Sequence, residues 1–340
     1  NSYMIASKKI ILISAGDPAS IAPEITIKAI QSSKINKNIQ PIIVTDSQII
    51  KDYNNNFKKN VIFNEIKDIH NFTDFKDNYF NIIPIKLSEK VVLGKPSIKN
   101  ANFVQESILK SVKIQMNSIA SAIVTNPINK NIMYKSGFKF NGHTEFLASL
   151  SIKKKVPVMM MVSNELKTIP LTIHEPLKKV PSLISKNLIL STIKIAAEDL
   201  NSYFGIKKPK IIVTGLNPHA GENGEIGEEE EKIIIPAIKE AKKNKNILLS
   251  GPLSSDIAFT SCIRKDYDVA ICMYHDQALI PIKTLAFDKG INVTLGLDFI
   301  RTSPDHGTGF DIARKNQANP DSLISSINLA YQMSINKTNE

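Results

Sequence analysis

Short apolar runs alternate with longer amphipathic segments along this chain. The short runs are rich in Ile, Val, Leu and Met and are bounded by Gly, Pro, Asn or Asp, which is typical of buried strands. We predict strands at residues 9–14, 41–46, 81–85, 121–127, 156–163, 167–174, 210–219, 246–253, 268–275 and 291–297.

In the longer segments, most clearly in the last two, apolar residues recur at steps of three and four, as on one face of a helix. We predict helices at residues 22–33, 100–116, 186–200, 228–244 and 322–335. Alternating strands and helices favour an α/β architecture with mostly parallel sheets. The 340 residues suffice for two domains. Since no low-complexity linker separates the elements, two domains would share a sheet or exchange chain more than once.

Several predicted strands end in polar segments that contain Gly, Pro or His. These segments read SAGDPAS, TNPINK, TIHEP, GLNPHAGE, GPLSSD and MYHDQ. In open α/β sheets, ligands bind beyond the carboxyl ends of the strands. We therefore expect these segments to line one shared cleft.

Composition narrows the choice of ligand. The net charge is +11, but the lysines are scattered singly among Asn and Ile, and no RNA-binding or zinc-finger signature accompanies them. We expect no nucleic-acid partner, whereas the excess positive charge favours an anionic small substrate. No apolar stretch approaches the ~18 residues that span a bilayer, so we expect no membrane partner. Two cysteines near apolar segments, Cys262 and Cys272, predict buried reduced thiols and a cytoplasmic location.

Histidines follow three of the predicted strands. His174, His219 and His275 each come after an apolar run, whereas His70 lies in a polar stretch and is predicted at the surface. Imidazoles from three strands could converge on one divalent ion and leave open positions for a substrate, as in a catalytic metal site. The alternative for each is a hydrogen-bonded structural histidine. Next to His275, Asp276 and Gln277 are interpreted as turn residues or as partners that orient the ligating imidazole.

Further polar residues suggest anion binding. His143 and Thr144 follow a glycine and precede a predicted helix, whose N-terminus could bind a phosphate or carboxylate, although Thr144 could equally cap the helix. Lys283, Asn292 and Arg301 follow His275 and could clamp a phosphate, with Arg as a bidentate donor. Each could also be a solvated surface group.

Two acidic features have different interpretations. Glu228–Glu231 is interpreted as a favourable first turn against the helix dipole, and Pro236 should kink that helix or mark its restart. Asp311 lies in the turn-rich segment DHGTGFDIARKNQANP, where a carboxylate could accept from a ribose 2′-hydroxyl and so favour NAD over NADP. The alternative for Asp311 is a helix-initiating role.

Taken as a set, these motifs resemble a known family. GDPASIAPE, NGHTEFLA, GLNPHAGE, GPLSSD, MYHDQALIPIK and NVTLGLDFIRTSPDHGT resemble, in order and spacing, the motifs of the PdxA family of 4-hydroxythreonine-4-phosphate dehydrogenases in vitamin B6 biosynthesis. The segment HGTGFDIARKNQANP is similar to the adenosine-binding loop of isocitrate and isopropylmalate dehydrogenases. The resemblance implies two α/β/α domains with a cleft between them. It places a nucleotide-side domain at 1–130 plus 290–340, and a metal and dimerisation domain at 131–289.

The resemblance also implies roles for individual residues. It assigns metal ligation to His174, His219 and His275, substrate binding to His143, Thr144, Lys283, Asn292 and Arg301, and nucleotide binding to Asp311 and Asn319. The implied cofactors are NAD, with NADP as the alternative, and a divalent metal ion, Zn2+, Mg2+ or Co2+. The implied assembly is a homodimer with the active site at its interface.

The implied reaction is oxidation of 4-phosphohydroxy-L-threonine at C3 to 2-amino-3-oxo-4-phosphooxybutanoate. This product decarboxylates to 3-amino-2-oxopropyl phosphate on the way to pyridoxal 5′-phosphate. We take Asp256 as the first candidate general base and Lys283 as the second. The alternatives are a dehydrogenase of erythronate or threonate 4-phosphate or of an aromatic cis-diol and, in a different class, a phosphate acyltransferase of similar fold.

Four positions depart from the family pattern. Ser20, Ala22, Ala278 and Arg314 stand where the family usually has glycine. Such a change is tolerable where the backbone is helical and costly where φ must be positive.

Overall fold

The computed structural model describes residues 8–67, 75–76, 78–140, 142–152 and 156–338, and His70 lies outside them. The chain forms two compact units. The first comprises Asn1–Lys155 and Leu297–Ser334, and the second comprises Val156–Gly296 and Ile335–Glu340. The chain passes between the units more than once, which agrees with the lack of a linker. The division into nucleotide and metal domains at 130/131 and 289/290 remains a prediction.

The first unit is built on strands in the order β3-β4-β2-β1-β5-β12. Each adjacent pair in this row is parallel. The strands are β1 (Lys9–Ser14), β2 (Ile39–Thr45), β3 (Phe63–Glu65), β4 (Phe80–Pro84), β5 (Ala122–Val124) and β12 (Arg301–Pro304).

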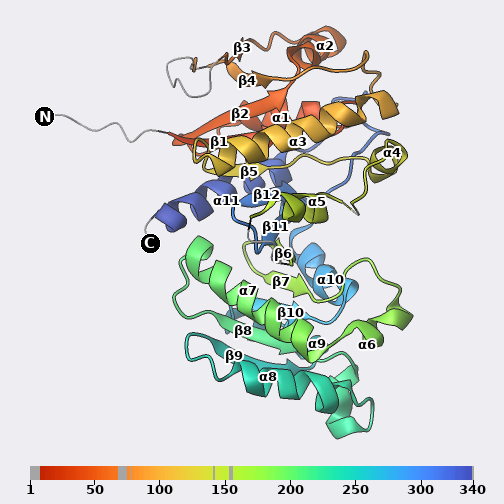
Figure 1. The fold of residues 1–340 in the computed structure, drawn as a ribbon, viewed down its shortest axis with the longest axis vertical. Helices are drawn as coiled ribbons and strands as arrows, with labels where there is room; N and C mark the ends of the chain where they lie inside the picture. Colours follow the sequence, from red (N-terminus) through yellow and green to blue (C-terminus); the bar gives the residue numbers. More distant parts are fainter. Residues whose placement is uncertain (1–7, 68–74, 77, 141, 153–155, 339–340) are drawn as a thin grey trace, which may run out of the picture. The chain divides into compact units, whose positions relative to one another are not determined.

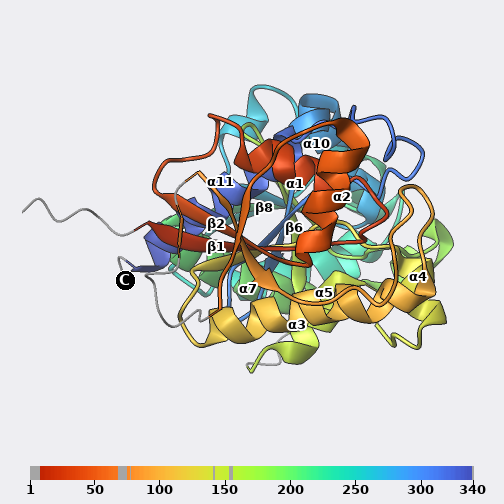
Figure 2. The ribbon, with the colours of Figure 1, turned by 90° about the horizontal axis from the view of Figure 1, so that it is seen from above.

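Alternate side chains of these buried strands face opposite layers of helices. Leu12 and Val44 pack in one cluster with Phe103 of α3, and Ile43 packs in another with Ile50 of α2. Accordingly, α3 lies on one side of β1 and β2, and α1 and α2 lie on the other (Figure 2). The helices are α1 (Ala22–Ile30), α2 (Ser47–Phe57), α3 (Ala101–Met116), α4 (Lys130–Lys135), α5 (His143–Leu150) and α11 (Asp321–Thr338), the last residues of which belong to the second unit.

The second unit has strands in the order β11-β6-β7-β10-β8-β9. The pairs β11–β6 and β6–β7 are antiparallel, and the remaining pairs are parallel, so the prediction of mostly parallel pairing is confirmed. The strands are β6 (Val158–Val162), β7 (Lys167–Pro170), β8 (Lys210–Thr214), β9 (Leu248–Leu253), β10 (Val269–Cys272) and β11 (Ile291–Leu295).

The helices of this unit pack on one another and on the strands. The helices α7 and α8 lie side by side (Figure 1), and α10 packs Ala278 and Leu279 on Met161 and Cys272 of the strands. A π-helical turn precedes α8, which restarts with Pro236 in its first turn, so the prediction for Pro236 is confirmed. The helices are α6 (Val180–Leu183), α7 (Lys186–Phe204), α8 (Ile235–Ala241), α9 (Ser255–Ala258) and α10 (His275–Ala286).

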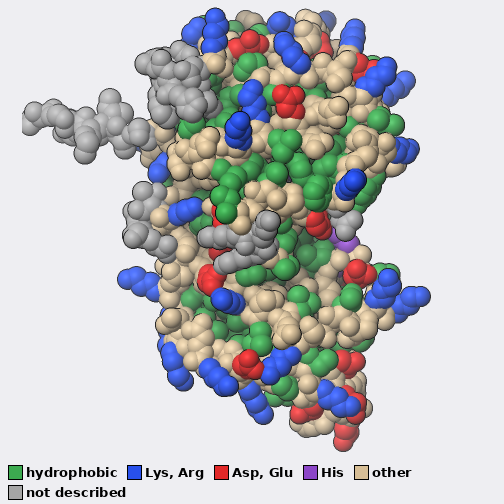
Figure 3. Space-filling model, in the orientation of Figure 1, with side chains coloured by type: hydrophobic (Ala, Val, Ile, Leu, Met, Phe, Trp, Pro, Cys, Tyr) green, Lys and Arg blue, Asp and Glu red, His purple; other side chains and the backbone are tan. Residues whose placement is uncertain are grey.

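Three surface expectations can be compared with the fold. Cys272 is buried, but Cys262 is exposed, so the prediction of a buried thiol is wrong there because Cys262 lies in a turn after α9. None of the described helices is long and apolar enough to cross a bilayer. On the face drawn in Figure 3, Lys and Arg side chains are dispersed among other types.

Candidate active site

Two predicted metal-binding histidines meet in the second unit. The ring centroids of His174 and His275 lie 5.5 Å apart. The predicted strands ran through these histidines, but β7 ends at Pro170 and β10 ends at Cys272. His174 therefore lies in a loop, with a positive φ of 53°, and His275 is the first residue of α10. Loops beyond neighbouring parallel strands bring the two imidazoles together.

Carboxylates orient two of the three imidazoles. Nδ1 of His275 lies 2.7 Å from Oδ1 of Asp276, and Nδ1 of His219 lies 2.8 Å from Oε2 of Glu222. Metal-ligating histidines usually bond through their second ring nitrogen to a carboxylate or carbonyl. This arrangement leaves Nε2 of both rings to face a ligand, so the side chains fit a divalent metal ion. Asp276 thus contacts His275 at the ring nitrogen where an orienting partner would lie, and its role there remains a prediction.

Among the described residues, no three His, Cys, Asp or Glu side chains gather closely enough to hold a metal within one chain. His219 instead lies near the first candidate base, Asp256. A hydrogen bond from Ser254, helped by the charge of His219, lowers the pKa of Asp256 below its ordinary value. A single chain thus brings His174 and His275 together and places His219 beside Asp256.

Gln277 ties together the segments that carry these residues. It is buried, and its Oε1 accepts from Met273 N at 2.7 Å and from Thr214 Oγ1 at 2.8 Å. Its Nε2 donates to Gly215 O at 2.8 Å and to Ser255 Oγ at 2.6 Å. The amide thereby joins the carboxyl ends of β8 and β10 to the start of α9. Gln277 therefore lies in α10 rather than in a turn, and both atoms of its buried amide are hydrogen-bonded.

A cluster of basic side chains, Arg301, His143 and Lys130, lies at the carboxyl end of β5 in the first unit. Arg301 on β12 is buried, and its Nε and Nη2 donate to Thr125 Oγ1 at 3.0 and 2.8 Å. The pairing of β12 with β5 places Arg301 opposite Ile123 and so beside this end of the sheet. Burial lowers the pKa of Arg301 to about 10, so the guanidinium remains charged at neutral pH.

His143 is the first residue of α5 and belongs to the same basic cluster. Burial, followed by the charges of Arg301 and Lys130, holds the pKa of His143 well below its ordinary value, so the ring is neutral at pH 7. Its Nε2 is buried without a hydrogen-bond partner, although part of the ring is exposed. Thr144 lies inside the first turn, and no side chain caps α5, so the capping alternative for Thr144 is wrong.

Lys130 was missed by the motif analysis. It is the first residue of α4, which Asn129 caps by accepting from Ile132 N at 3.1 Å. A Cβ placed on Gly142 would lie 3.7 Å from Lys130 Nζ, so this ammonium approaches the start of α5. The only signal in the sequence was its place in TNPINK, a polar segment after a strand. With Lys130, the basic cluster can neutralise and hydrogen-bond an anion.

Asp17 is a second group that the motif analysis missed. It is buried after β1, and its backbone N donates to Pro127 O at 3.0 Å. Burial raises the pKa of Asp17 to about 6, although a hydrogen bond from Ala19 N partly opposes the shift. A buried carboxyl with a raised pKa at the carboxyl end of a strand is a candidate functional group.

We expect Asp17→Asn to stabilise the fold above pH 6. Between pH 3.8 and 6 the folded state retains a proton that the unfolded state has lost, so Asp17 lowers the free energy of unfolding as pH rises through this window. Above pH 6 the ionised Asp17 lowers the free energy of unfolding by about 2–3 kcal/mol. Below pH 3.8 the group is protonated in both states, and this loss of stability vanishes. Urea unfolding at pH 4 and pH 8 measures the difference. The exposed Asp266→Asn is the control, and equal effects of both variants would contradict the assignment.

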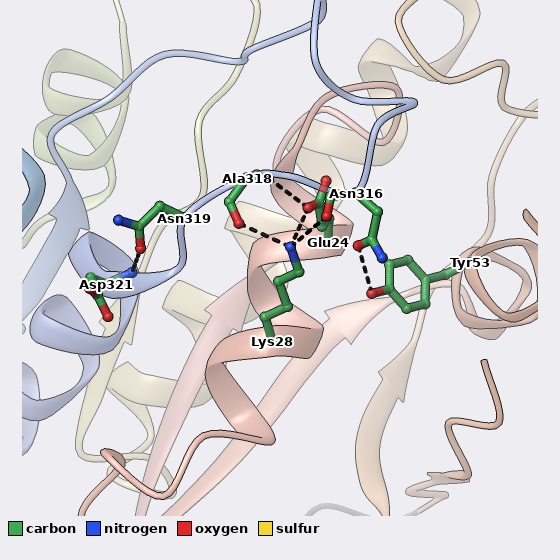
Figure 4. Close-up of polar contacts among 7 residues, drawn as sticks. All are labelled: Glu24, Lys28, Tyr53, Asn316, Ala318, Asn319 and Asp321. Carbon is green, nitrogen blue, oxygen red and sulfur yellow. Dashed lines mark hydrogen bonds and ion pairs between the residues drawn. The ribbon is translucent and has the colours of Figure 1, made fainter. Parts of the chain in front are cut away.

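The predicted nucleotide loop is fastened to α1 and α2 (Figure 4). Glu24 Oε1 accepts from Lys28 Nζ at 2.6 Å and from Ala318 N at 2.7 Å. Lys28 Nζ also donates to the carbonyls of Asn316 and Ala318, and Tyr53 OH lies 3.1 Å from Asn316 Oδ1. These contacts, of which the bond from Ala318 N to Glu24 is buried, hold the loop on the first unit.

The two predicted nucleotide ligands lie on the surface of this loop. Asp311 is exposed. Asn319 is also exposed, and its Oδ1 accepts from Asp321 N at 2.9 Å at the start of α11. The Asp311 carboxylate and the Asn319 amide nitrogen can therefore meet a ligand from solvent.

The glycine replacements are compatible with the backbone. Ser20, Ala22, Ala278 and Arg314 are all outside the set of positive-φ residues. Ala278 lies inside α10, where its carbonyl accepts from Thr168 Oγ1 at 3.0 Å, and Arg314 Nε donates to Leu93 O at 2.6 Å. These positions therefore carry no left-handed strain.

The remaining predicted substrate ligands, Lys283 and Asn292, belong to the second unit. Asn292 lies on β11, and its Oδ1 is buried without a hydrogen-bond partner. Lys283 lies on α10, with its Nζ 5.9 Å from the ring centroid of Phe287. His143, Thr144 and Arg301 belong to the first unit.

An α/β fold with polar and titratable side chains gathered after the carboxyl ends of its strands is typical of enzymes that act on small molecules. A family model described as "Pyridoxal phosphate biosynthetic protein PdxA" matches residues 37–330, and the chain belongs to this family. It is 51% identical over 248 residues to 4-hydroxythreonine-4-phosphate dehydrogenase of Bradyrhizobium diazoefficiens, covering 72% of each chain. It is 39% identical over 337 residues to an enzyme of that name in Methylorubrum extorquens, covering 97% of this chain and 96% of the relative.

Solved structures show the same fold. The 4-hydroxythreonine-4-phosphate dehydrogenase of Klebsiella pneumoniae superposes with a TM-score of 0.86 and 33% identity, covering 96% of this chain and 100% of the other. A branched-chain phosphotransacylase of Enterococcus faecalis gives a TM-score of 0.54 at 12% identity, covering 95% of this chain and 99% of the other. The latter likeness concerns the fold alone. The predictions of family and of an α/β fold are confirmed.

Proposed function

We infer that this chain is a 4-hydroxythreonine-4-phosphate dehydrogenase of pyridoxal phosphate biosynthesis. Its membership of the PdxA family carries this inference, supported by two relatives that bear that name. The reaction removes a hydride from C3 of the substrate and a proton from the C3 hydroxyl. The resulting β-keto acid, 2-amino-3-oxo-4-phosphooxybutanoate, loses CO2 to give 3-amino-2-oxopropyl phosphate. The hydride acceptor is a nicotinamide dinucleotide, and exposed Asp311 favours NAD over NADP.

His174, His219 and His275 would hold a divalent metal ion, Zn2+, Mg2+ or Co2+. When bound, such an ion lowers the pKa of a coordinated hydroxyl and favours its deprotonation near neutral pH. Support comes from the close approach of two of the rings and from the carboxylates on Nδ1 of His219 and His275. The carboxylates fix the orientation of these rings and favour ligation through Nε2.

The basic cluster of Arg301, His143 and Lys130 would bind the substrate phosphate in the first unit. Arg301 and Lys130 supply positive charge, and neutral His143 can donate one hydrogen bond. Thr144 would add a hydroxyl donor. Lys283 and Asn292 of the second unit would contact the substrate as well, and the unpartnered Oδ1 of Asn292 supports a ligand there.

Asp256 would accept the hydroxyl proton. Because Ser254 and His219 lower its pKa, this carboxylate is ionised at neutral pH and able to accept a hydrogen bond. Its low basicity means that the hydroxyl must itself be acidified before transfer. Lys283 remains the alternative base.

A homodimer would complete the site. In one chain only two of the three imidazoles meet among the described residues, so a third donor from a second copy would complete the set. Large apolar side chains are exposed on the second unit, which carries the candidate metal ligands, namely Leu177, Ile257, Ile280 and Phe287. Burial of such residues in an obligate interface is favourable, and Phe287 is 74% exposed in the single chain.

An assay of NADH formation tests the function. The purified chain is given 4-phosphohydroxy-L-threonine or 4-phosphoerythronate, with NAD and Co2+, with and without a chelator. We expect turnover of the first substrate only, and loss of this turnover when the chelator is present. Turnover of 4-phosphoerythronate with a higher kcat/KM would favour the sugar-acid alternative instead.

A further inference from the structure

The loop that carries His219 adopts a left-handed backbone. His219, Ala220, Gly221, Glu222 and Asn223 all have positive φ, between 44° and 84°. For residues other than glycine this conformation is unfavourable, because Cβ comes too close to the following carbonyl oxygen. Such a turn persists only where the surrounding structure holds it in place.

Glu230 binds the base of this loop. Its Oε1 accepts from Leu216 N at 2.7 Å and from Asn217 N at 2.8 Å, and its Oε2 accepts from Asn217 Nδ2 at 2.9 Å. A Cβ placed on Gly221 would lie 2.7 Å from Oε2, so the carboxylate also packs directly against the left-handed turn. From the other side, Gln277 donates to the carbonyl of Gly215.

Burial sets Glu230 apart from its acidic neighbours. Glu230 is 1% exposed, whereas Glu228 and Glu231 are exposed. Glu230 lies in the first turn of its helix, as the interpretation of Glu228–Glu231 expected. In addition, its carboxylate accepts hydrogen bonds from the turn at Leu216 and Asn217. A buried carboxylate that accepts three such bonds is stable only while these donors stay in place.

We propose that Glu230 is a positioning residue that holds the strained turn, and with it the imidazole of His219, in the orientation needed to ligate a divalent metal ion. The proposal rests on the proposed function, because it takes His219 as a metal ligand. Glu230 acts through the backbone of Leu216 and Asn217. The metal ion then binds a preformed ligand and need not order the loop itself.

Co2+ titration of the full-length protein, followed by visible absorption, tests the proposal. Glu230→Gln keeps the size of the side chain but replaces one carboxylate oxygen with an NH2 group. This NH2 group would face N–H donors of the loop and could not accept their hydrogen bonds. We expect its Kd for Co2+ to rise about 10- to 100-fold, and its absorption spectrum at saturating Co2+ to change. The matched control is Glu231→Gln, which changes an exposed carboxylate one residue away and should keep the original Kd. Equal Kd values and spectra for the two variants would overturn the proposal.

Two further measurements separate the failure of this proposal from failure of the proposed function. His219→Ala should itself weaken Co2+ binding. If it does not, the three-histidine site is wrong, whereas a normal Kd in Glu230→Gln alone refutes only the positioning role. Amide hydrogen exchange of the metal-free natural chain gives an answer even if the Glu230 variant does not fold. Leu216 and Asn217 should be protected before metal is added, and unprotected exchange would overturn the proposal.

Discussion

Replacement of His275 by alanine should lower kcat/KM for metal-dependent NADH formation at least about a thousand-fold, because a lost ligand removes several kcal/mol of Lewis-acid stabilisation. The fold should survive. His275 is the first residue of α10, part of its side chain is exposed, and alanine is a good helix former. NADH formation with and without added Co2+ measures the effect, and thermal unfolding checks the fold.

Asp276→Asn should reduce the same activity by a smaller factor than His275→Ala. It keeps the imidazole of His275 and removes the charge of its partner at Nδ1. A reduction of about 10- to 100-fold is expected, smaller than that of His275→Ala. Full activity in His275→Ala, with or without metal, would refute the three-histidine model.

Arg301→Ala should raise KM for 4-phosphohydroxy-L-threonine about 10- to 100-fold, because a hydrogen-bonded charge contributes about 1.5–3 kcal/mol. For the unphosphorylated analogue, 4-hydroxy-L-threonine, the change in KM should be much smaller. Arg301 is buried on Thr125 and raises the positive potential around His143, which favours an anion beside both. Steady-state kinetics with both substrates measures the ratio.

Two further variants show whether the rise in KM comes from the loss of the Arg301 guanidinium. Arg301→Lys keeps the charge but loses the planar donor pair, so an intermediate KM is expected. Arg264→Ala removes a surface ion pair with Glu165 and should leave both KM values unchanged. An equal rise in KM for the two substrates in Arg301→Ala would count against a phosphate clamp.

The regular elements were largely predictable from the hydrophobic pattern. All ten predicted strands correspond to strands of the structure, because continuous Ile, Val and Leu runs are buried on both faces of parallel sheets. β3 and β12 were missed, the first being only three residues long and the second reading RTSP. α2 was missed because its Asn-rich sequence has low helix propensity, and α10 because a short apolar run containing Pro281 fits either strand or loop.

The types of residue in the site were predictable, but the hydrogen bonds that hold them in place were not. His174 and His275 were identifiable because each follows an apolar run at the end of a strand, and parallel strands bring such ends together. Lys130 and Glu230 were not. From the sequence, Lys130 is indistinguishable from a surface lysine, and Glu230 is one of four consecutive glutamates. Nothing local distinguishes them, since their surroundings come from distant segments of the chain.

The sequence by itself determined the α/β class, the order of strands and helices along the chain, and the histidines that the family motifs share. These depend on periodicity and on local residue identity, which each segment carries alone. Only the tertiary structure decided that Arg301 bonds to Thr125, 176 residues away, and that Gln277 joins three segments. It also decided that Glu230 is buried beneath a left-handed turn. Burial and hydrogen bonding at such positions depend on which strands become neighbours, and that is a property of the whole fold.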